Sequence, residues 1–423
     1  MAGISLKQAK NNIVPDLAGN FAYGYNQGRN VDPITNNYIN QQLYCSTIGF
    51  GTGVVLYNGM RLQNQVKQNN TDKAAAEKAL QFSKDDLILK LMQAYLQIMS
   101  SAEVAKITAS QLAVTKNQLN RMATLVKEGV VGNYQFTDLE GQYASEEINM
   151  LEAANALQVA KLNICQLMNI DYDSAIIFLP APGSETMSKY SKTVPQVFNS
   201  ALRNFALLNL QQLNVKSAQH GIAISRGGFA PTISFNANIG SSYSSLARML
   251  TPITLTEITT DNYVLINGVK QPVLASQQNY FFSRSAYLNQ SNNNLYTFVG
   301  INVAIPFFNR LQTKTNVALA KKQLSNQQYQ LDKVQLQLKQ NIEKAYLDMN
   351  TAYNRYEVLQ RQVGSFSESF RAAAIRYESG TINSVEYLLV KNNLDRAAIN
   401  QTVARYEYLF RTKLLDFYEA GRR

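Results

Sequence analysis

The 423-residue sequence contains no tryptophan, one histidine and two cysteines. A single histidine, His220, excludes histidine-rich zinc sites and facial-triad metal sites, and it gives no basis for a His-based catalytic triad. Cys45 and Cys165 have no metal-ligand spacing and form no disulfide framework. No nucleophile–base pair and no phosphate-binding loop is present. We therefore expect no metal, no cofactor and no enzymatic activity.

Long hydrophobic runs and charge clusters are also missing. No stretch of 18 or more apolar residues occurs, which excludes a transmembrane helix. The polar start "MAGISLKQAKNNIVP" shows no signal-peptide pattern. The net charge is +11, but basic residues are scattered singly, with no run of five or six. We interpret them as solvated helix faces and expect no nucleic-acid partner.

The sequence does contain a long internal duplication. Asn58 and Gly129 recur 251 positions later as Asn309 and Gly380, and the register holds without a gap from about 57 to about 165. A repeat of this length is a duplicated structural unit, not a short solenoid repeat. Each unit contains two alternating segments, a long helix, a glycine and a shorter helix. We predict a first structural repeat at 1–168, an equatorial linker at 169–193 and a second structural repeat at 194–423.

Very long helices are predicted in both units. The patterns run over about 59–127 and 310–378, and helices of that size are about 100 Å long. Shorter helices are predicted at about 134–168 and 385–418, and a further one at 194–224.

Within the long helices, apolar positions recur every seven residues, which indicates coiled-coil packing. A free-standing coiled-coil rod would show the same pattern. The positions are Leu91, Ile98, Ala105, Leu112, Leu119 and Val126 in the first copy, and Ile342, Met349, Tyr356, Val363, Phe370 and Tyr377 in the second.

Each unit also carries two segments that alternate large apolar residues with small or polar ones. Such segments are long enough to cross a bilayer when tilted, and apolar-out, polar-in alternation is typical of membrane β-barrels. A half-buried soluble sheet would show the same alternation. Four strands cannot close a barrel, and open edges are not tolerated in lipid, so we expect an oligomer sharing one barrel. The predicted lipid-facing residues are Phe21, Tyr23, Phe50, Phe235 and Ile301.

One loop joins the two strands of each pair. Residues 28–42 form a polar loop of modest length, and residues 247–294 form a long loop that we expect to be extracellular. Within it, Asn267-Gly268 between β-rich flanks predicts a type I′ hairpin.

A family resemblance follows from the duplication, the strand–strand–long-helix order and the segment "RYESGTINSVEYLL". In that segment Tyr377 is followed by Gly380 three residues on and by Glu386 six further on. The sequence thereby resembles the TolC-type outer-membrane efflux family over nearly its whole length. Gln135 stands where family members often have Asp, and Ile382 where a basic residue often occurs. The polar lock that closes the tips of family members is therefore only partly represented.

This resemblance implies an α+β membrane protein. It would combine a long antiparallel coiled-coil helical barrel with a four-strand contribution per protomer to a shared transmembrane β-barrel. The implied function is a passive exit duct of a tripartite efflux or type I secretion system. It would lie in the bacterial outer membrane, with a periplasmic helical domain. The implied partners are two further copies in a homotrimer, a periplasmic adaptor (membrane fusion protein), an inner-membrane pump of RND, ABC or MFS type, and outer-membrane lipid.

The implied gate lies at the helix tips. Glu386 would form an acidic ring that favours cations, or would be a first-turn carboxylate stabilised by the helix dipole. The predicted tip and gate residues are Gly129, Val130, Gln135, Arg376, Tyr377, Gly380 and Glu386.

One departure and one alternative accompany this resemblance. Pro15 and Pro231 occupy equivalent places before their strands, but only a short segment precedes Pro15, where the family has a full lead helix. From this we expect part of the lead helix and the signal peptide to be missing. The alternative function is a soluble periplasmic coiled-coil adaptor or scaffold with a β domain, which would purify without detergent.

Overall fold

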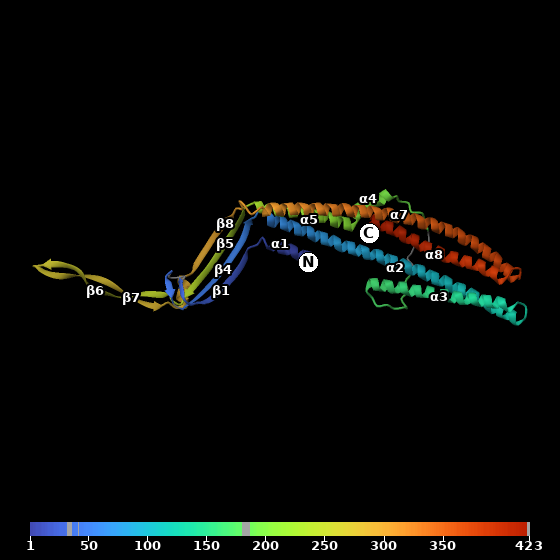
Figure 1. Ribbon diagram of the computed structural model, residues 1–423, viewed down its shortest axis with the longest axis horizontal. Helices are drawn as coiled ribbons and strands as arrows, with labels where there is room; N and C mark the ends of the chain where they lie inside the picture. The colour runs from blue at the N-terminus through green and yellow to red at the C-terminus, as the bar shows by residue number, and fades with distance from the viewer. Residues whose placement is uncertain (32–35, 41, 180–186, 421–423) are drawn as a thin grey trace. The chain divides into compact units, whose positions relative to one another are not determined.

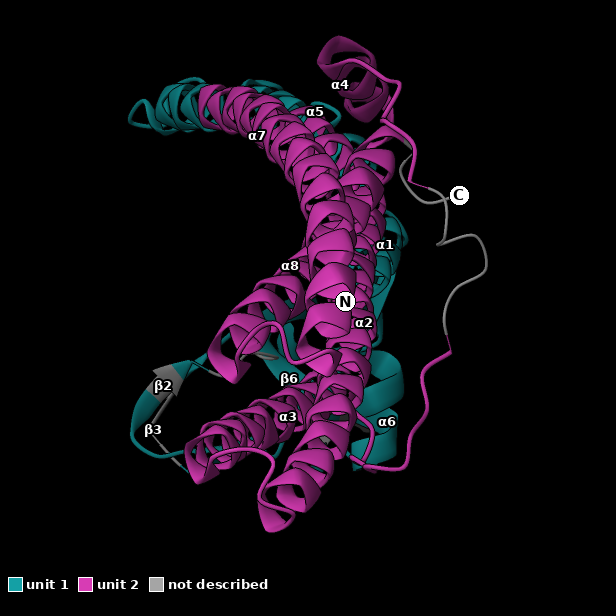
Figure 2. Cartoon of the chain, turned by 90° about the vertical axis from the view of Figure 1, so that its right-hand side faces the viewer, with its two compact units in different colours: residues 1–70, 217–323 teal, residues 71–216, 324–423 magenta. Residues whose placement is uncertain are grey.

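The computed structural model describes residues 1–31, 36–40, 42–179 and 187–420. The chain divides into two compact units, shown in different colours in Figure 2. We call residues 1–70 and 217–323 the β unit, and residues 71–216 and 324–423 the helical unit. Each unit takes segments from both sequence repeats, so the compact units do not coincide with the repeats.

A four-stranded antiparallel sheet dominates the β unit (Figure 1). The strand order is β1-β4-β5-β8, so β4 and β5 are central and join the two repeats, while β1 and β8 are the edges. All four strands predicted from the alternation are present. They are β1 (Asp16–Asn26), β4 (Leu43–Tyr57), β5 (Thr232–Ser244) and β8 (Tyr296–Ala304).

The long loop predicted at 247–294 contains a two-stranded hairpin and a short helix. Asn267 and Gly268 have φ of +53° and +85°. A type I′ turn requires positive φ at both central residues, so the predicted turn is confirmed. The elements are β6 (Arg248–Ile266), β7 (Val269–Arg284) and α6 (Tyr287–Asn293).

The shorter loop, predicted at 28–42, holds the small pair β2 (Arg29–Val31) and β3 (Tyr38–Asn40). Residues 32–35 and 41 of this loop lie outside the described part of the chain.

Both long helices begin after a pair of left-handed residues. Gly59 and Met60 have φ of +69° and +61°, and the residues 251 positions later, Arg310 and Leu311, have +53° and +60°. Left-handed residues cannot belong to a right-handed helix, so the predicted starts at 59 and 310 were two residues too early. The helices are α2 (Arg61–Lys127) and α7 (Gln312–Glu378).

The helix predicted over 194–224 is interrupted at Phe205, where ψ is 118° and the backbone is extended. The Phe205 ring contacts the rings of Phe82 and Tyr418, with centroids 6.2 and 6.1 Å away. The extended backbone at Phe205 ends one helix and starts the next, and the Phe205 ring lies in this aromatic contact. The prediction of one continuous helix was therefore wrong. The two helices are α4 (Val194–Asn204) and α5 (Ala206–Arg226).

The other helices include α1 (Ala2–Asn11), which precedes β1 as α5 precedes β5. The two shorter helices predicted after the glycines are α3 (Asn133–Met168) and α8 (Ser384–Ala420). Within the described residues, no helix combines the length and hydropathy needed to cross a bilayer.

Apolar seams hold the helical unit together. Ile342 and Met349 of the predicted seven-residue series are 0% and 1% exposed, as is Ile98 at 1%. Buried alanines follow three residues after the two α7 positions, at Ala345 and Ala352, which completes the heptad pattern of a coiled coil. One core joins α4, α7 and α8, a second joins α2 and α3, and a third joins the ends of α7 and α8.

Candidate functional site

Each long helix ends in a turn that depends on glycine. Gly129 and Gly380 have φ of +77° and +70°. The N–H groups of Val130 and Thr381 each donate to the carbonyl five residues earlier, at 3.0 and 2.9 Å. This is the bonding of a Schellman C-cap, which requires a left-handed residue. No heavy atom lies within 4 Å of the place where a Cβ on either glycine would be, so conformation alone requires glycine.

The tip between α7 and α8 has a small aromatic core. The rings of Tyr377 and Tyr387 stack with centroids 4.6 Å apart, and Phe370 lies 5.6 Å from Tyr387. Ile382, where family members often carry a basic residue, is buried in the same cluster. Burial raises the pKa of Tyr387 to about 12, so its hydroxyl is neutral at physiological pH. The sequence prediction included Tyr377 but missed Tyr387.

The predicted charged residues of this tip lie together on its surface. Arg376 Nη1 is 3.6 Å from Glu386 Oε1, and both side chains are about half exposed. An exposed ion pair of this kind contributes about 0–1 kcal/mol. Glu386 lies in the first turn of α8, where its backbone N–H donates to Asn383 Oδ1 at 2.9 Å. A carboxylate is favoured at this end of a helix dipole.

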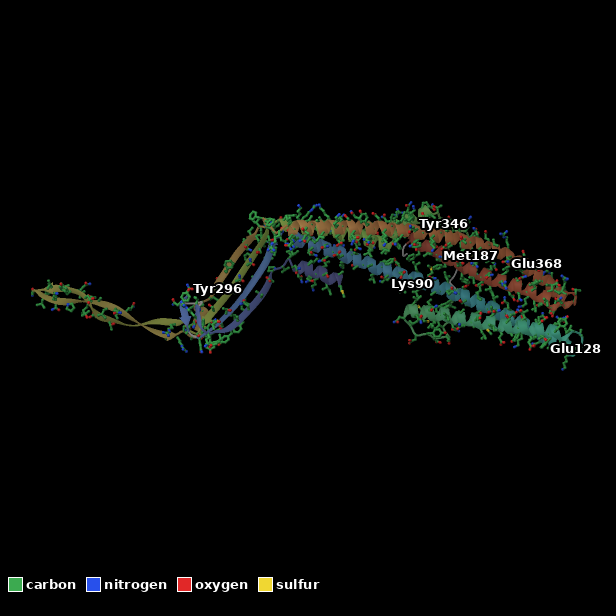
Figure 3. All side chains as sticks on the ribbon, viewed as in Figure 1. Lys90, Glu128, Met187, Tyr296, Tyr346 and Glu368 are labelled. Carbon is green, nitrogen blue, oxygen red and sulfur yellow. The ribbon has the colours of Figure 1, made fainter. Side chains whose placement is uncertain are left out.

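The tip between α2 and α3 is more open. Val130 is 66% exposed, and Gln135 Nε2 donates to the Tyr134 hydroxyl at 3.1 Å, within its own turn. Figure 3 labels Glu128, the residue before Gly129, at this end of α2. The structure therefore brings Arg376, Tyr377 and Glu386 together at one tip, while Val130 and Gln135 belong to the other.

The four-stranded sheet has one face of large apolar residues. Phe21 pairs with Ile48, Phe50 with Ile239, and Phe235 with Ile301. Because directly paired residues of antiparallel strands point to the same side, this register places all five predicted lipid-facing residues on one face. Phe21 and Ile301, on the edge strands, are 67% and 65% exposed, whereas Phe235 on central β5 is partly covered.

The opposite face of the sheet is mostly glycine, other small residues and asparagine, and it also carries Asp16 of β1 and the rings of Tyr296 and Phe298 of β8. A Cβ on Gly51 would lie 2.5 Å from Asn238 Oδ1, and one on Gly49 would lie 3.0 Å from Asn20 Oδ1. The glycines of β4 therefore leave the room that asparagine side chains of β5 and β1 occupy. The middle of this face therefore presents amides instead of a packed apolar core.

A buried charged cluster in the helical unit was missed by sequence reasoning. Lys391 Nζ lies 2.8 Å from Glu146 Oε1 and 2.8 Å from Asp395 Oδ2. Glu146 belongs to the buried seven-residue series of α3, with Leu139, Ala153 and Ala160. A glutamate in this otherwise apolar series is visible in the sequence and could have indicated a buried charged cluster.

Comparison with known proteins identifies the family. The sequence matches the outer membrane efflux protein family (OEP) over residues 2–169 and 197–415. No curated protein matches the sequence.

Solved outer-membrane proteins share the fold. CusC superposes with a TM-score of 0.78 at 13% identity, covering 100% of this chain and 86% of CusC. The outer membrane protein VceC of Vibrio cholerae gives 0.76 at 13% identity, covering 99% and 90%. The MtrE outer membrane channel of Neisseria gonorrhoeae, in its open state, gives 0.73 at 16% identity, covering 99% and 83%.

The chain belongs to the outer membrane efflux protein family. It is an exit duct of bacterial efflux systems, located in the outer membrane with a periplasmic helical part. The predicted resemblance, fold class, function and location are thereby confirmed, and the soluble adaptor alternative is not supported.

Proposed function

We propose that three copies of this chain form one passive duct. The four strands of each copy join a shared transmembrane β-barrel, and the helices form a periplasmic tunnel. A periplasmic adaptor and an inner-membrane pump of RND, ABC or MFS type supply the substrate and the energy. In this proposal the linker at 169–193 separates the repeats at 1–168 and 194–423, and the loop at 247–294 is extracellular.

The proposal rests on the two faces and the two edges of the four-stranded sheet. One face is apolar and the other consists mostly of small and amide residues, which suits a wall between lipid and water. Among the described residues, no further strand pairs with the outer edges of β1 and β8. Unpaired backbone groups are not tolerated in lipid, and the smallest closed barrels have about eight strands, so neighbouring copies must supply partners for these edges.

The gate in this proposal is formed by the tips, at 129–133 and 380–383. The ion pairs there are surface contacts, Arg376 with Glu386 at 3.6 Å and Arg121 with Glu378 at 3.7 Å. Contacts of this kind are weak and exchange easily with water, so rearranging them costs little. The open state described for MtrE supports an opening motion within this fold. In the closed state Glu386 faces the narrow end of the tunnel.

Tryptophan fluorescence tests the lipid-facing positions, because the chain has no tryptophan of its own. Phe21→Trp, Phe235→Trp and Ile301→Trp should each be quenched strongly by lipids with brominated acyl chains. Ala22→Trp is the matched control, since it neighbours Phe21 on the opposite face and should be quenched by aqueous acrylamide instead. Shielding of the first three from brominated lipid would contradict the proposed orientation.

The oligomeric state is tested by native mass spectrometry in detergent. The expected mass is three times that of the 47.3 kDa chain. A stable monomer that remains folded would contradict the shared barrel.

A further inference from the structure

The hairpin of β6 and β7 starts and ends with two arginines that lie directly opposite each other (Figure 1). Arg248, the first residue of β6, pairs with Arg284, the last residue of β7. Directly paired residues of antiparallel strands point to the same side, with Cβ atoms about 4.5–5.5 Å apart, and like charges there are destabilising. Both arginines are exposed, and within the described part of the chain neither forms an ion pair. Two guanidinium groups therefore share one side of the hairpin with no carboxylate to neutralise them.

The base of the hairpin is tied to the end of the four-stranded sheet. The Ser285 N–H group donates to the Ala247 carbonyl at 3.2 Å, next to the arginine pair. Gln290 of α6 is 4% exposed, and its Nε2 donates to the carbonyls of Ser244 and Ser285 at 3.0 and 2.9 Å. These bonds hold the backbone from which the two arginines project, so the pair is a fixed feature of the β unit.

Tyrosine rings mark the end of the apolar face from which the hairpin continues. Tyr25 pairs with Tyr44, with ring centroids 5.1 Å apart, and Tyr23 lies on the same face, 6.4 Å from Tyr44. Tyrosines gather where a bilayer meets water, because their rings are apolar and their hydroxyls are polar. The Tyr44 carbonyl accepts from the Ser245 N–H group at 2.9 Å. Arg248 follows three residues later, at most about 11 Å along the chain, which places it at the level of the lipid headgroups.

The charge at this end of the sheet is of one sign. Residues 17–31, 36–56, 232–256 and 276–304 contain no aspartate or glutamate, and their only charged residues are Arg29, Arg248 and Arg284. A guanidinium group is always charged and binds phosphate oxygens through two parallel N–H···O bonds. Phosphate is an anion that lipid headgroups carry at this level of a membrane. The arginine pair therefore matches a lipid phosphate in charge, geometry and position.

We propose that Arg248 and Arg284 form a binding site for the phosphate of a lipid headgroup in the outer leaflet, such as the lipid A part of lipopolysaccharide. A phosphate between the two guanidinium groups turns an unfavourable like-charge pair into a bridged one and holds the base of the hairpin at the membrane surface. The inference rests on the proposed function, because it requires strands that span the membrane and a loop at 247–294 that faces outside.

Native mass spectrometry of the assembled protein in detergent, titrated with lipid A, tests the site. Arg248→Glu places a carboxylate opposite Arg284, so the hairpin gains a favourable cross-strand pair while the site loses its double positive charge. A hydrogen bond between charged groups contributes enough for about a 10–100-fold change in affinity, so the Kd for lipid A should rise by about that factor.

Lys270→Glu is the matched control, because it changes the net charge by the same amount near the tip of the hairpin. Lys270 lies over the Tyr263 ring, 4.1 Å from its centroid, and is not part of the arginine pair. This variant should bind lipid A as the wild type does. Equal weakening by Arg248→Glu and Lys270→Glu, or no weakening by Arg248→Glu, would overturn the site.

The wild-type protein gives a second test that does not depend on the folding of a variant. Lipid A should bind at least about tenfold more tightly than its dephosphorylated form, and inorganic phosphate at the same concentration should leave lipid A bound. Equal binding of the two lipid forms would overturn the site, and displacement by inorganic phosphate would overturn the assignment to a lipid.

The same spectra separate this inference from the proposed function. An assembly of three chains that fails the lipid tests would leave the duct standing without the site. A folded chain that appears only as a monomer would instead contradict the proposed function, and the lipid site with it.

Discussion

Replacing Gly380 by alanine isolates what the tip glycine contributes. Its φ is +70°, and no heavy atom lies within 4 Å of the place where a Cβ would be. The added methyl group therefore meets no neighbour, and the cost is conformational only. An L-residue in the left-handed region costs about 1–2 kcal/mol relative to the right-handed one. The tip should open locally about 5–30 times more often than in the wild type.

Hydrogen–deuterium exchange of the tip measures this opening. The Thr381 amide, bonded to the Arg376 carbonyl at 2.9 Å, reports on the turn and should exchange about 5–30 times faster in Gly380→Ala. Gly364→Ala is the matched control, because Gly364 lies inside α7 with equally open space and no positive φ. It should stabilise the helix by about 1 kcal/mol. If Gly380→Ala exchanged no faster while Gly364→Ala behaved as expected, the role assigned to the positive φ would be wrong.

Two further predictions concern the core and the strand–helix junction. Ile342→Ala should lower the free energy of unfolding by about 2–5 kcal/mol, because Ile342 is fully buried. Leu347→Ala, on the exposed side of α7, should change it by no more than about 0.5 kcal/mol. Thermal unfolding measures both variants, and equal losses of stability would contradict the assigned seam. Gly59 has a φ of +69°, and Gly59→Ala would place a Cβ 2.4 Å from the Gly227 carbonyl oxygen. This variant should therefore prevent accumulation of assembled protein in the outer membrane, whereas Met60→Gly should be tolerated. Immunoblots of membrane fractions measure both variants, and normal levels of Gly59→Ala would refute the assigned close contact.

Periodic features of this protein could be predicted from sequence. Alternation over β1, β4, β5 and β8 and a seven-residue spacing over α2 and α7 repeat many times, so local exceptions do not hide them. The duplication adds a second, independent copy of each pattern. The two tip glycines were found in the same way, because the repeat aligns Gly129 with Gly380.

Features that depend on single contacts could not be predicted. Arg310 and Leu311 adopt left-handed conformations that their side chains do not favour. In the sequence, only their alignment with Gly59 and Met60 in the first repeat could have indicated this conformation. Phe205 fits a helical apolar pattern, yet its contacts with two other rings interrupt the helix. At Phe205, aromatic packing overrides local preference.

The buried charged cluster of Lys391, Glu146 and Asp395 was missed for a related reason. Lysine and glutamate on amphipathic helices usually belong to solvated faces, which is how the basic residues of this chain were interpreted. Burial becomes visible only when three helices are seen together, since Thr115, Glu146 and Lys391 come from α2, α3 and α8.

The amide-lined face of the sheet has a consequence for what the proposed duct can discriminate. Amide dipoles of residues such as Asn20, Asn236 and Asn238 can turn either a carbonyl oxygen or an N–H group toward a passing molecule. Such amides can interact with cations, anions and neutral solutes alike, and the exceptions on this face are the rings of Tyr296 and Phe298 and the carboxylate of Asp16. The amides themselves would not select a cargo, so the choice of cargo would fall mainly to the partner proteins that deliver it.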